Sequence, residues 1–308
     1  MKYKLFKLQF STAVHFGAGG LTTTSDTLMA DTVFSALCTE AAKAGTDPSS
    51  FIDAVKEGRL RISDALPFIG DRFYVPKPLA EITSDKEGDS SIKKALKRLP
   101  YIPVDCLEEY MNGMLNIIEE ADVFQKCLGQ EYLVEKAAVE TGEETRPYAV
   151  DLYRYYKGSG LYICLGYEKD DDYYLFSDLL EILSYAGIGG KISSGYGRFT
   201  AVPIVPSKEF AKRLEGKNWK QYLSLSVCLP GREELDGVMQ DANVRLCKRS
   251  GWVSPGLGTE QLRKRKDIYM FTSGSVFKNP FSGCLFDLSD GGSHPVLRYG
   301  YPMFMGVN

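Results

Sequence analysis

The stretch from residue 187 to residue 198 has the residue types that a phosphate-binding loop uses. It holds five glycines in twelve residues, together with two cations and two serines. Glycines let a backbone approach a ligand closely and aim successive N–H groups at an anion. A tight helix-to-strand connection also uses glycine, but it needs only one or two. The candidate phosphate contacts are Gly187, Gly189, Gly190, Lys191, Ser193, Ser194, Gly195, Tyr196 and Arg198.

Two established phosphate-binding motifs are excluded by the spacing in this stretch. A Walker A loop needs glycine five residues before the Gly190–Lys191 pair, where the chain has Tyr185. It also needs Ser or Thr after the lysine, where the chain has Ile192. The dinucleotide fingerprint would place its third glycine at that same residue 192. The stretch therefore predicts contact with a phosphate backbone, and no cofactor is expected.

A second candidate site is the basic segment from residue 243 to residue 266. It carries seven Lys or Arg residues against one Glu, a net charge of +6 in a chain whose formal net charge is −3. Positive charge beside an aromatic ring is what binding of single-stranded nucleic acid requires. A solvated basic face is the alternative. The candidate RNA contacts are Arg245, Lys248, Arg249, Trp252, Arg263 and Lys264.

His15 lies with Phe16 and Gly17 in a glycine-rich segment after the first expected strand. A histidine there could act as a general acid or base. No Cys or Ser stands beside it in a nucleophile motif, so we expect these three residues to cap a segment or to contact a base or phosphate. The seven cysteines include no C-x-x-C pair, which disfavours a disulfide framework and a zinc site. No metal is expected.

Composition limits the class of protein. With 44% hydrophobic and 25% charged residues, the 308-residue chain is typical of a folded protein of two domains. Because 37 Lys and Arg face 40 Asp and Glu, any site for a polyanion must be local. No apolar run approaches the roughly 20 residues of a membrane span. Lysines interrupt the first eight residues, unlike a signal peptide, so a cytoplasmic location and no membrane contact are expected.

Apolar periodicity predicts an α+β fold. A strand to Phe10, a helix over 26–44 capped by Ser25 or Asp26, and short strands over 60–75 come first. A strand over 161–167, a helix carrying Phe176 to Leu183, and a strand over 199–205 follow an insertion at 76–150. This is the order of a ferredoxin-like, split β-α-β domain.

The expected organisation is a first domain over 1–205, a charged linker over 206–218, and a β-rich second domain over 219–308. The insertion is acidic in its second part: residues 105–144 hold eleven Asp and Glu against two Lys. Such a run is usually a solvated face, and docking onto a basic partner is the alternative.

Several motifs together resemble the RAMP superfamily of CRISPR proteins. His15-Phe16-Gly17 with 25–37 looks like the N-terminal signature of that superfamily, and 187–199 looks like its glycine-rich loop. With 248–253, 273–277 and 291–301, the chain is similar to the family of fourth Csm subunits of type III-A effector complexes. The resemblance spans nearly the whole chain.

The resemblance implies tandem ferredoxin-like, RRM-related domains that hold the 5′ handle of the CRISPR RNA. It also implies docking between the large polymerase-domain subunit and the backbone RAMP subunits, and a β-hairpin thumb, within 76–150, that kinks the guide–target duplex. Such subunits are taken to be non-catalytic. No segment fits the aromatic RNP1 pattern of an RRM, so RNA is expected on loops. A RAMP endoribonuclease that uses His15, and a scaffold without RNA contact, are the alternatives.

Overall fold

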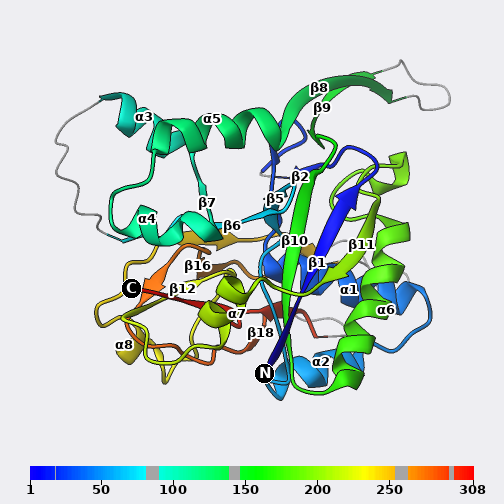
Figure 1. The fold of residues 1–308 in the computed structure, drawn as a ribbon. Helices are drawn as coiled ribbons and strands as arrows, with labels where there is room; N and C mark the ends of the chain where they lie inside the picture. Colours follow the sequence, from blue (N-terminus) through cyan, green and yellow to red (C-terminus); the bar gives the residue numbers. More distant parts are fainter. Residues whose placement is uncertain (18, 81–89, 139–145, 254–262, 291–294) are drawn as a thin grey trace.

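The computed structural model describes residues 1–308 except 18, 81–89, 139–145, 254–262 and 291–294, and it does not describe the side chain of Arg263. Its centre is an antiparallel sheet of order β11-β1-β10-β5-β6-β7, in which β4 also pairs with β10 (Figure 1). These strands are β1 (Lys2–Phe10), β4 (Leu60–Ile62), β5 (Leu66–Ile69), β6 (Arg72–Pro76), β7 (Tyr101–Pro103), β10 (Ser159–Tyr167) and β11 (Phe199–Ile204).

The expected order of elements in the first half is confirmed. Helix α1 (Ala30–Lys43) follows β1, and α6 (Asp170–Ala186) joins β10 to β11, which gives β-α-β-β-α-β. Helix α2 (Ser49–Lys56) precedes β4. The expected cap of the first helix is wrong, because α1 begins after Met29 and the N–H of Ala30 donates to the carboxylate of Asp64 at 2.7 Å.

The insertion between β6 and β10 forms helices and a long hairpin. The helices are α3 (Ser90–Arg98), η1 (Val104–Cys106), α4 (Leu107–Met111) and α5 (Ile117–Cys127). The hairpin pairs β8 (Gly129–Ala138) with β9 (Arg146–Tyr155) and projects from the body of the protein (Figure 1). It ends at residue 155, five residues beyond the expected end of the insertion at 150.

The second half is mainly β in the part that the structure describes, as expected. A three-stranded sheet orders β17 (Val276–Phe277), β12 (Gln221–Ser224) and β20 (Phe304–Val307). Two-stranded pairs join β13 (Leu246–Arg249) to β16 (Ile268–Phe271), β14 (Trp252–Val253) to β15 (Arg263–Lys264), and β18 (Leu285–Asp287) to β19 (Leu297–Tyr299). Helix α8 (Leu235–Val238) is short. A second ferredoxin-like domain stays a prediction.

Residues 206–218 differ from the expected linker, because they form helix α7 (Lys208–Glu215). The Ser207 side chain accepts a hydrogen bond from the N–H of Phe210 at 3.2 Å, which caps the helix. Phe210, Arg213 and Leu214 follow the i, i+3, i+4 spacing of a buried helix face. High charge alone therefore did not distinguish a linker from an amphipathic helix.

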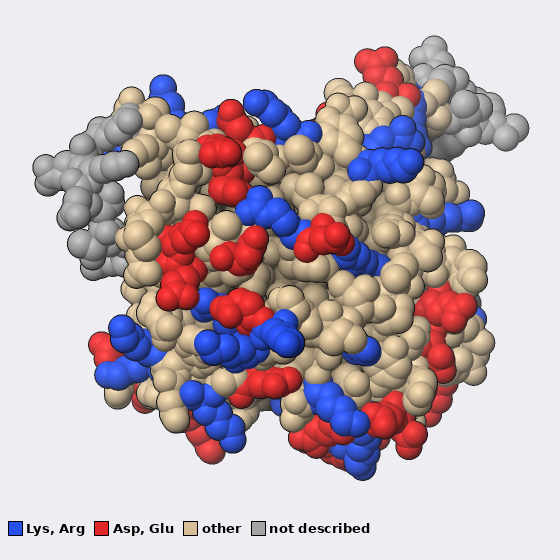
Figure 2. Space-filling model, in the orientation of Figure 1, with Lys and Arg blue, Asp and Glu red and all other residues tan. Residues whose placement is uncertain are grey.

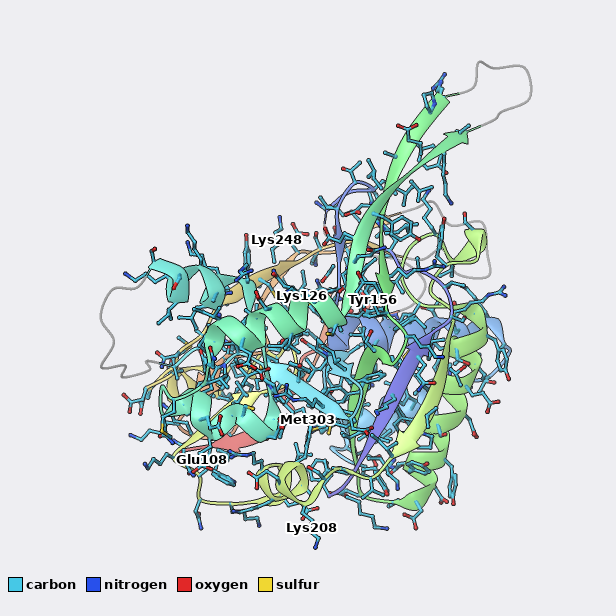
Figure 3. All side chains as sticks on the ribbon, turned by 45° about the horizontal axis from the view of Figure 1, so that its top comes forward. Glu108, Lys126, Tyr156, Lys208, Lys248 and Met303 are labelled. Atoms are coloured by element: carbon cyan, nitrogen blue, oxygen red, sulfur yellow. The ribbon has the colours of Figure 1, made fainter. Side chains whose placement is uncertain are left out.

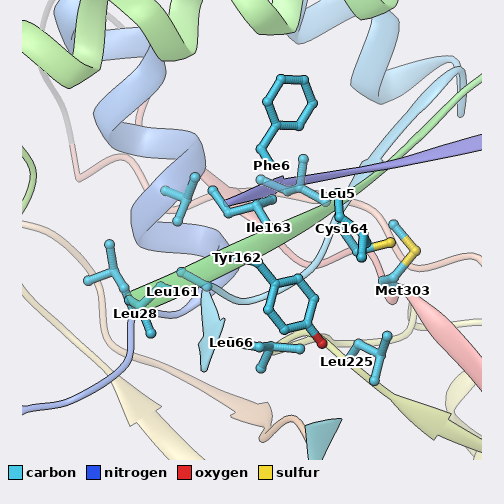
Figure 4. Close-up of a cluster of buried hydrophobic side chains, with 14 of the residues drawn as sticks. Leu5, Phe6, Leu28, Leu66, Leu161, Tyr162, Ile163, Cys164, Leu225 and Met303 are labelled. Atoms are coloured by element: carbon cyan, nitrogen blue, oxygen red, sulfur yellow. The ribbon is translucent and has the colours of Figure 1, made fainter. Parts of the chain in front are cut away.

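One hydrophobic core joins the two halves of the chain. Leu225 and Met303 of the second half lie with Tyr162 and Cys164 of β10 in the same cluster (Figure 4). The N–H of Ile62 donates to the hydroxyl of Tyr299 at 2.9 Å, across the same contact. No helix of the described residues is long and apolar enough to cross a bilayer.

Asp64 also ties the halves together and gives a pH-dependent stability. Its Oδ1 accepts from the N–H groups of Ala30 and Val227 at 2.7 and 2.9 Å. Burial raises the pKa of Asp64 to about 6 from 3.8, although these hydrogen bonds oppose the shift. Between those pH values the folded chain binds more protons at this carboxyl than the unfolded chain does, so stability falls as pH rises from about 4 to about 6.

Asp64→Asn is expected to remove this fall. The measurement is the free energy of unfolding by urea at pH 4, 5, 6 and 7 for both proteins. Since other carboxyl groups titrate in both, the difference between the two curves isolates Asp64. A constant difference across this range would contradict the assignment.

Candidate nucleic-acid interface

A strap at residues 11–17 brings the glycine-rich stretch against the base of the hairpin. The N–H groups of Gly190 and Gly197 donate to the carbonyls of His15 and Ala13 at 2.8 and 2.9 Å. On the other side, Val14 and Tyr153 of β9 exchange two backbone hydrogen bonds of 2.8 and 2.9 Å. Strand β2 (Phe16–Gly17) continues the strap and pairs with β3 (Thr24–Ser25). The structure thus joins two sequence-predicted sites that lie about 170 residues apart.

His15 positions the hairpin and is buried. Its side chain is 5% exposed, and the Nδ1–H donates to the backbone carbonyl of Asp151 at 2.8 Å. The Asp151 carboxylate accepts from the N–H of Thr24 at 3.2 Å. Phe16 is also buried and packs edge-on against Phe10. Burial of the side chains of His15 and Phe16 disfavours their expected contact with RNA, which stays a prediction, whereas Gly17 is exposed.

The glycines mainly serve close packing within the chain. The N–H groups of Gly187 and Gly195 donate to the carbonyls of Leu183 and Ile192 at 2.8 and 2.9 Å. With those of Gly190 and Gly197, four glycine N–H groups are therefore engaged by the protein. A Cβ at Gly189 would lie 2.7 Å from the carbonyl oxygen of His15. Phosphate is thus not the partner of these N–H groups, and the exposed side chains of Ser193, Ser194 and Arg198 remain the candidate contacts.

Two cation–π contacts join this loop to the hairpin. The Lys191 ammonium lies 4.9 Å from the ring centroid of Tyr148, and the Lys136 ammonium lies 4.5 Å from that of Tyr196. Lys136 and Tyr148 are partners in the register of β8 and β9, so they share one face of the hairpin. The result is a face of alternating cations and rings. Lys136 and Tyr148 were not predicted from the sequence, because the acidic net charge of the insertion suggested no contact with RNA.

The basic segment forms an exposed ribbon. Lys248 of β13 pairs with Tyr269 of β16, and Trp252 of β14 pairs with Lys264 of β15 (Lys248 is labelled in Figure 3). Trp252 is 63% exposed and Tyr269 58% exposed. Rings at this exposure are available to stack on bases. Tyr269 was missed, although its alternation with the buried Met270 is the pattern of a strand with one exposed face.

The cations of the ribbon differ in what they contact. Lys248 and Lys264 lie 2.8 and 3.9 Å from the carboxylate of Asp267, and Arg245 is exposed. The hydrogen bond from Lys248 lowers the pKa of Asp267. By contrast, Nε and Nη2 of Arg249 donate to the Asp31 carboxylate at 2.8 and 2.9 Å. Arg249 is therefore a partner of a buried carboxylate, unlike the exposed lysines, and its contact with RNA stays a prediction.

The side chain of Arg263 lies outside the part of the chain that the structure describes. A cavity of about 580 Å³ lies elsewhere, between the N-terminal residues, α7 and β20. Its lining includes Tyr3, Arg61 and Arg213 and, among the described residues, none of the sequence-predicted contacts. In the described part of the chain, no three His, Cys, Asp or Glu side chains gather as metal ligands.

The glycines at 195 and 197 provide a matched test of this packing. Both have positive φ, +84° and +79°, which favours glycine. A Cβ at Gly197 would overlap the backbone of Ile188, whereas a Cβ at Gly195 would meet nothing within 4 Å. We expect Gly195→Ala to cost about 1 kcal/mol of stability from backbone strain alone, and Gly197→Ala to cost several times more. Urea unfolding measures both, and equal losses would contradict the close approach.

Comparison with protein families decides the identity of the fold. The family described as the RAMP superfamily matches residues 7–200, and the CRISPR Csm4 C-terminal domain matches residues 217–307. The chain belongs to the Csm4 family. The resemblance inferred from the sequence motifs is thereby confirmed.

Proteins described as Csm4 match this chain along its length. The chain is 33% identical over 308 residues to the CRISPR system Cms protein Csm4 of Mycobacterium tuberculosis, covering 100% of this chain and 98% of that protein. It is 31% identical over 319 residues to the protein of the same description from Streptococcus thermophilus, covering 99% and 98%.

Solved structures share the fold. A chain of the Csm3–Csm4 subcomplex of a type III-A CRISPR–Cas interference complex superposes with a TM-score of 0.68 at 17% identity, covering all of both chains. A chain of a Csm1–Csm4 cassette in complex with pppApA gives a TM-score of 0.61 at 19% identity, covering 100% of this chain and 98% of that one. The α+β fold is thus that of Csm4 structural relatives.

Proposed function

We propose that this Csm4-family chain is a non-catalytic RNA-binding subunit of a type III-A CRISPR effector complex, and that it holds the 5′ handle of the CRISPR RNA. The exposed ribbon carries the proposal, because Trp252 and Tyr269 stand beside Lys248 and Lys264. Exposed rings stack on bases of any sequence, and neighbouring cations neutralise the phosphates between them. A single-stranded segment is the nucleic acid that fits this surface.

The junction of the hairpin and the glycine-rich loop supports a second RNA contact. Lys136, Tyr148, Lys191 and Tyr196 alternate charge and ring there, next to the exposed Arg198. In this proposal the β8–β9 hairpin is the thumb that kinks the guide–target duplex. Its base is fixed by the strap through His15 and Val14, so the hairpin has a firm support for that contact.

Docking to neighbouring subunits is assigned to the insertion. Acidic side chains lie over α4 and α5, with basic side chains among them (Figure 2). Glu120 pairs with Arg72, and Asp122 with Arg98, whereas Glu109, Glu119 and Met114 are exposed. The related chains in subcomplexes named Csm3–Csm4 and Csm1–Csm4 support a subunit that bridges the large polymerase-domain subunit and the backbone subunits.

The burial of His15 supports a non-catalytic role. A general acid or base must come within hydrogen-bond reach of the proton that it transfers. The Nδ1 of His15 is engaged by the Asp151 carbonyl, and its Cδ2 would lie 2.7 Å from a Cβ at Gly190. The imidazole is thus enclosed by its own loop. An endoribonuclease that uses His15 needs this loop to open.

The test is to incubate the purified chain, and the reconstituted complex, with repeat RNA and to resolve RNA mobility and RNA length. We expect a mobility shift without any product, and His15→Ala is expected to leave RNA lengths unchanged. A product that disappears in His15→Ala would establish the endoribonuclease instead. Neither shift nor product, from the chain alone or from the complex, would identify a scaffold without RNA contact.

A further inference from the structure

A cluster of arginines surrounds Asp31 at the start of α1. Asp31 is fully buried, and Arg249 donates to both of its carboxylate oxygens from the end of β13. Arg298 of β19 donates to the same carboxylate through Nη1. Burial alone would raise the pKa of Asp31, but Arg249 and Arg298 hold it below its usual value. Asp31 is therefore ionised and neutralises one of its two hydrogen-bonded arginines.

The arginines keep donors for which the described part of the chain offers no acceptor. Arg298 is 1% exposed, yet its Nε and Nη2 are buried and have no hydrogen-bond partner among the residues that the structure describes. Arg265 lies in the connection between β15 and β16. Its Nε is also buried without a described partner, while its Nη2 donates to the carbonyl of Ser250 at 2.7 Å. Buried donors of a charged group are strongly unfavourable when they are left unpaired. The cluster lacks acceptors.

The cluster also carries more positive than negative charge. Arg249 and Arg298 donate to a single carboxylate, that of Asp31, and Arg265 beside them donates to a carbonyl. The Asp267 carboxylate near Arg265 is shared with Lys248 and Lys264. Burial, followed by repulsion from Arg298, lowers the pKa of Arg265 to about 10. The pKa of Arg298 is lowered by burial and by Arg249 as well. An anion with several acceptor oxygens would satisfy both the free donors and the excess charge.

We propose that Arg249, Arg265 and Arg298 form a binding site for a phosphate group. Guanidinium groups match phosphate oxygens with pairs of hydrogen bonds. The site is reached from the surface, since Arg249 and Arg265 are half-buried and the adjoining Ser250 and Lys266 are exposed. As Arg249 ends β13 and Arg265 precedes β16, the site adjoins the ribbon on the side that faces Asp31. The source of the phosphate is a backbone phosphate of the RNA strand, and this last step rests on the proposed function.

The experiment compares the wild-type full chain with Arg265→Gln, and uses inorganic phosphate as the probe. Arg265 has no hydrogen bond to Asp31 and is repelled by its neighbours, so this variant is expected to be as stable as the wild type or more stable without phosphate. Phosphate at ten times its Kd is expected to raise the wild-type Tm by about 2 °C, and Arg265→Gln is expected to lose that increment. Lys278→Gln, which removes an exposed cation paired with Asp241, should keep it.

The outcomes separate the site from the source of its phosphate. An equal response to phosphate in wild type and Arg265→Gln, at matched ionic strength, would overturn the site, as would loss of stability in Arg265→Gln without phosphate. If RNA is the source, Arg265→Gln also weakens binding of handle RNA by about tenfold. RNA affinity that is unchanged while the phosphate increment is lost would overturn RNA as the source and assign a free phosphate compound. If the wild type binds no RNA at all, the proposed function fails and the phosphate measurement still stands.

Discussion

Asp31→Ala is expected to lower the free energy of unfolding by about 3–5 kcal/mol, which is the usual loss when one partner of a buried ion pair is removed. The reason is the arginine cluster, in which Arg249 and Arg298 both donate to this carboxylate. Without Asp31 their charges stay buried and uncompensated. Because α1 belongs to the first half of the chain and both arginines to the second, the loss also loosens the contact between the halves.

Urea unfolding measures this loss, and Asp267→Ala is the matched control. Asp267 is an exposed carboxylate near Arg265 of the same cluster, and it is paired with Lys248 at 2.8 Å. Exposed pairs contribute about 0–1 kcal/mol, so the control should change stability little. Equal effects of the two substitutions would contradict a buried role for Asp31. In the double variant Asp31→Ala with Arg298→Met, part of the stability should return, because one buried charge is removed with its partner.

Most of the first half of the fold could be predicted because its elements have clean periodicity. Strand β1 alternates apolar and polar residues from Phe6 to Phe10, and α1 repeats its apolar positions every three to four residues. These patterns report which face is buried, and burial decides the element. The order of the elements then indicated the split β-α-β topology. The helix at 208–215 escaped the same reasoning because only Phe210 and Leu214 mark its apolar face.

The candidate site was predicted by residue type, and residue type does not report burial. Arg249 and Lys248 are neighbours in the sequence, but a strand turns alternate side chains to opposite faces. Lys248 therefore extends outward with Tyr269, while Arg249 reaches Asp31. The partner of Arg249 lies 218 residues away, so no local pattern could have shown the pair. The same holds for His15, whose role depends on the carbonyl of Asp151.

The glycine-rich stretch shows a similar limit. Its density of glycine correctly indicated close approach of a backbone, but the partner is the strap of the same chain. Sequence alone did not distinguish glycines that admit a ligand from glycines that admit a neighbouring segment. The structure distinguishes the two, because it places the stretch at the base of the hairpin, where Lys191 and Tyr196 contact hairpin side chains.

Removing both rings of the ribbon is expected to have the largest effect on RNA binding. Trp252→Ala with Tyr269→Ala should weaken binding of handle RNA by about a hundredfold, since each stacked base contributes about 1–3 kcal/mol. The dependence of affinity on salt should stay nearly the same, because no charge is removed. Tyr174→Ala, at an exposed ring of α6, is the control and should bind normally.

Lys248→Gln and Lys264→Gln should behave differently in the same filter-binding titrations. Each removes one phosphate contact, so each should lower affinity and also reduce the log–log salt slope by about 0.7, the value for single strands. Arg249→Gln does not belong to this series, because its guanidinium is held by Asp31 and its removal should lower stability instead. If the ribbon is only a solvated basic surface, the lysine variants will keep the wild-type salt slope and the variant without the two rings will bind RNA normally. If the lysine variants change the salt slope while the variant without the rings binds normally, the ribbon attracts phosphates and stacking on bases is excluded. The two series together therefore decide whether the ribbon holds the bases, the phosphates or both.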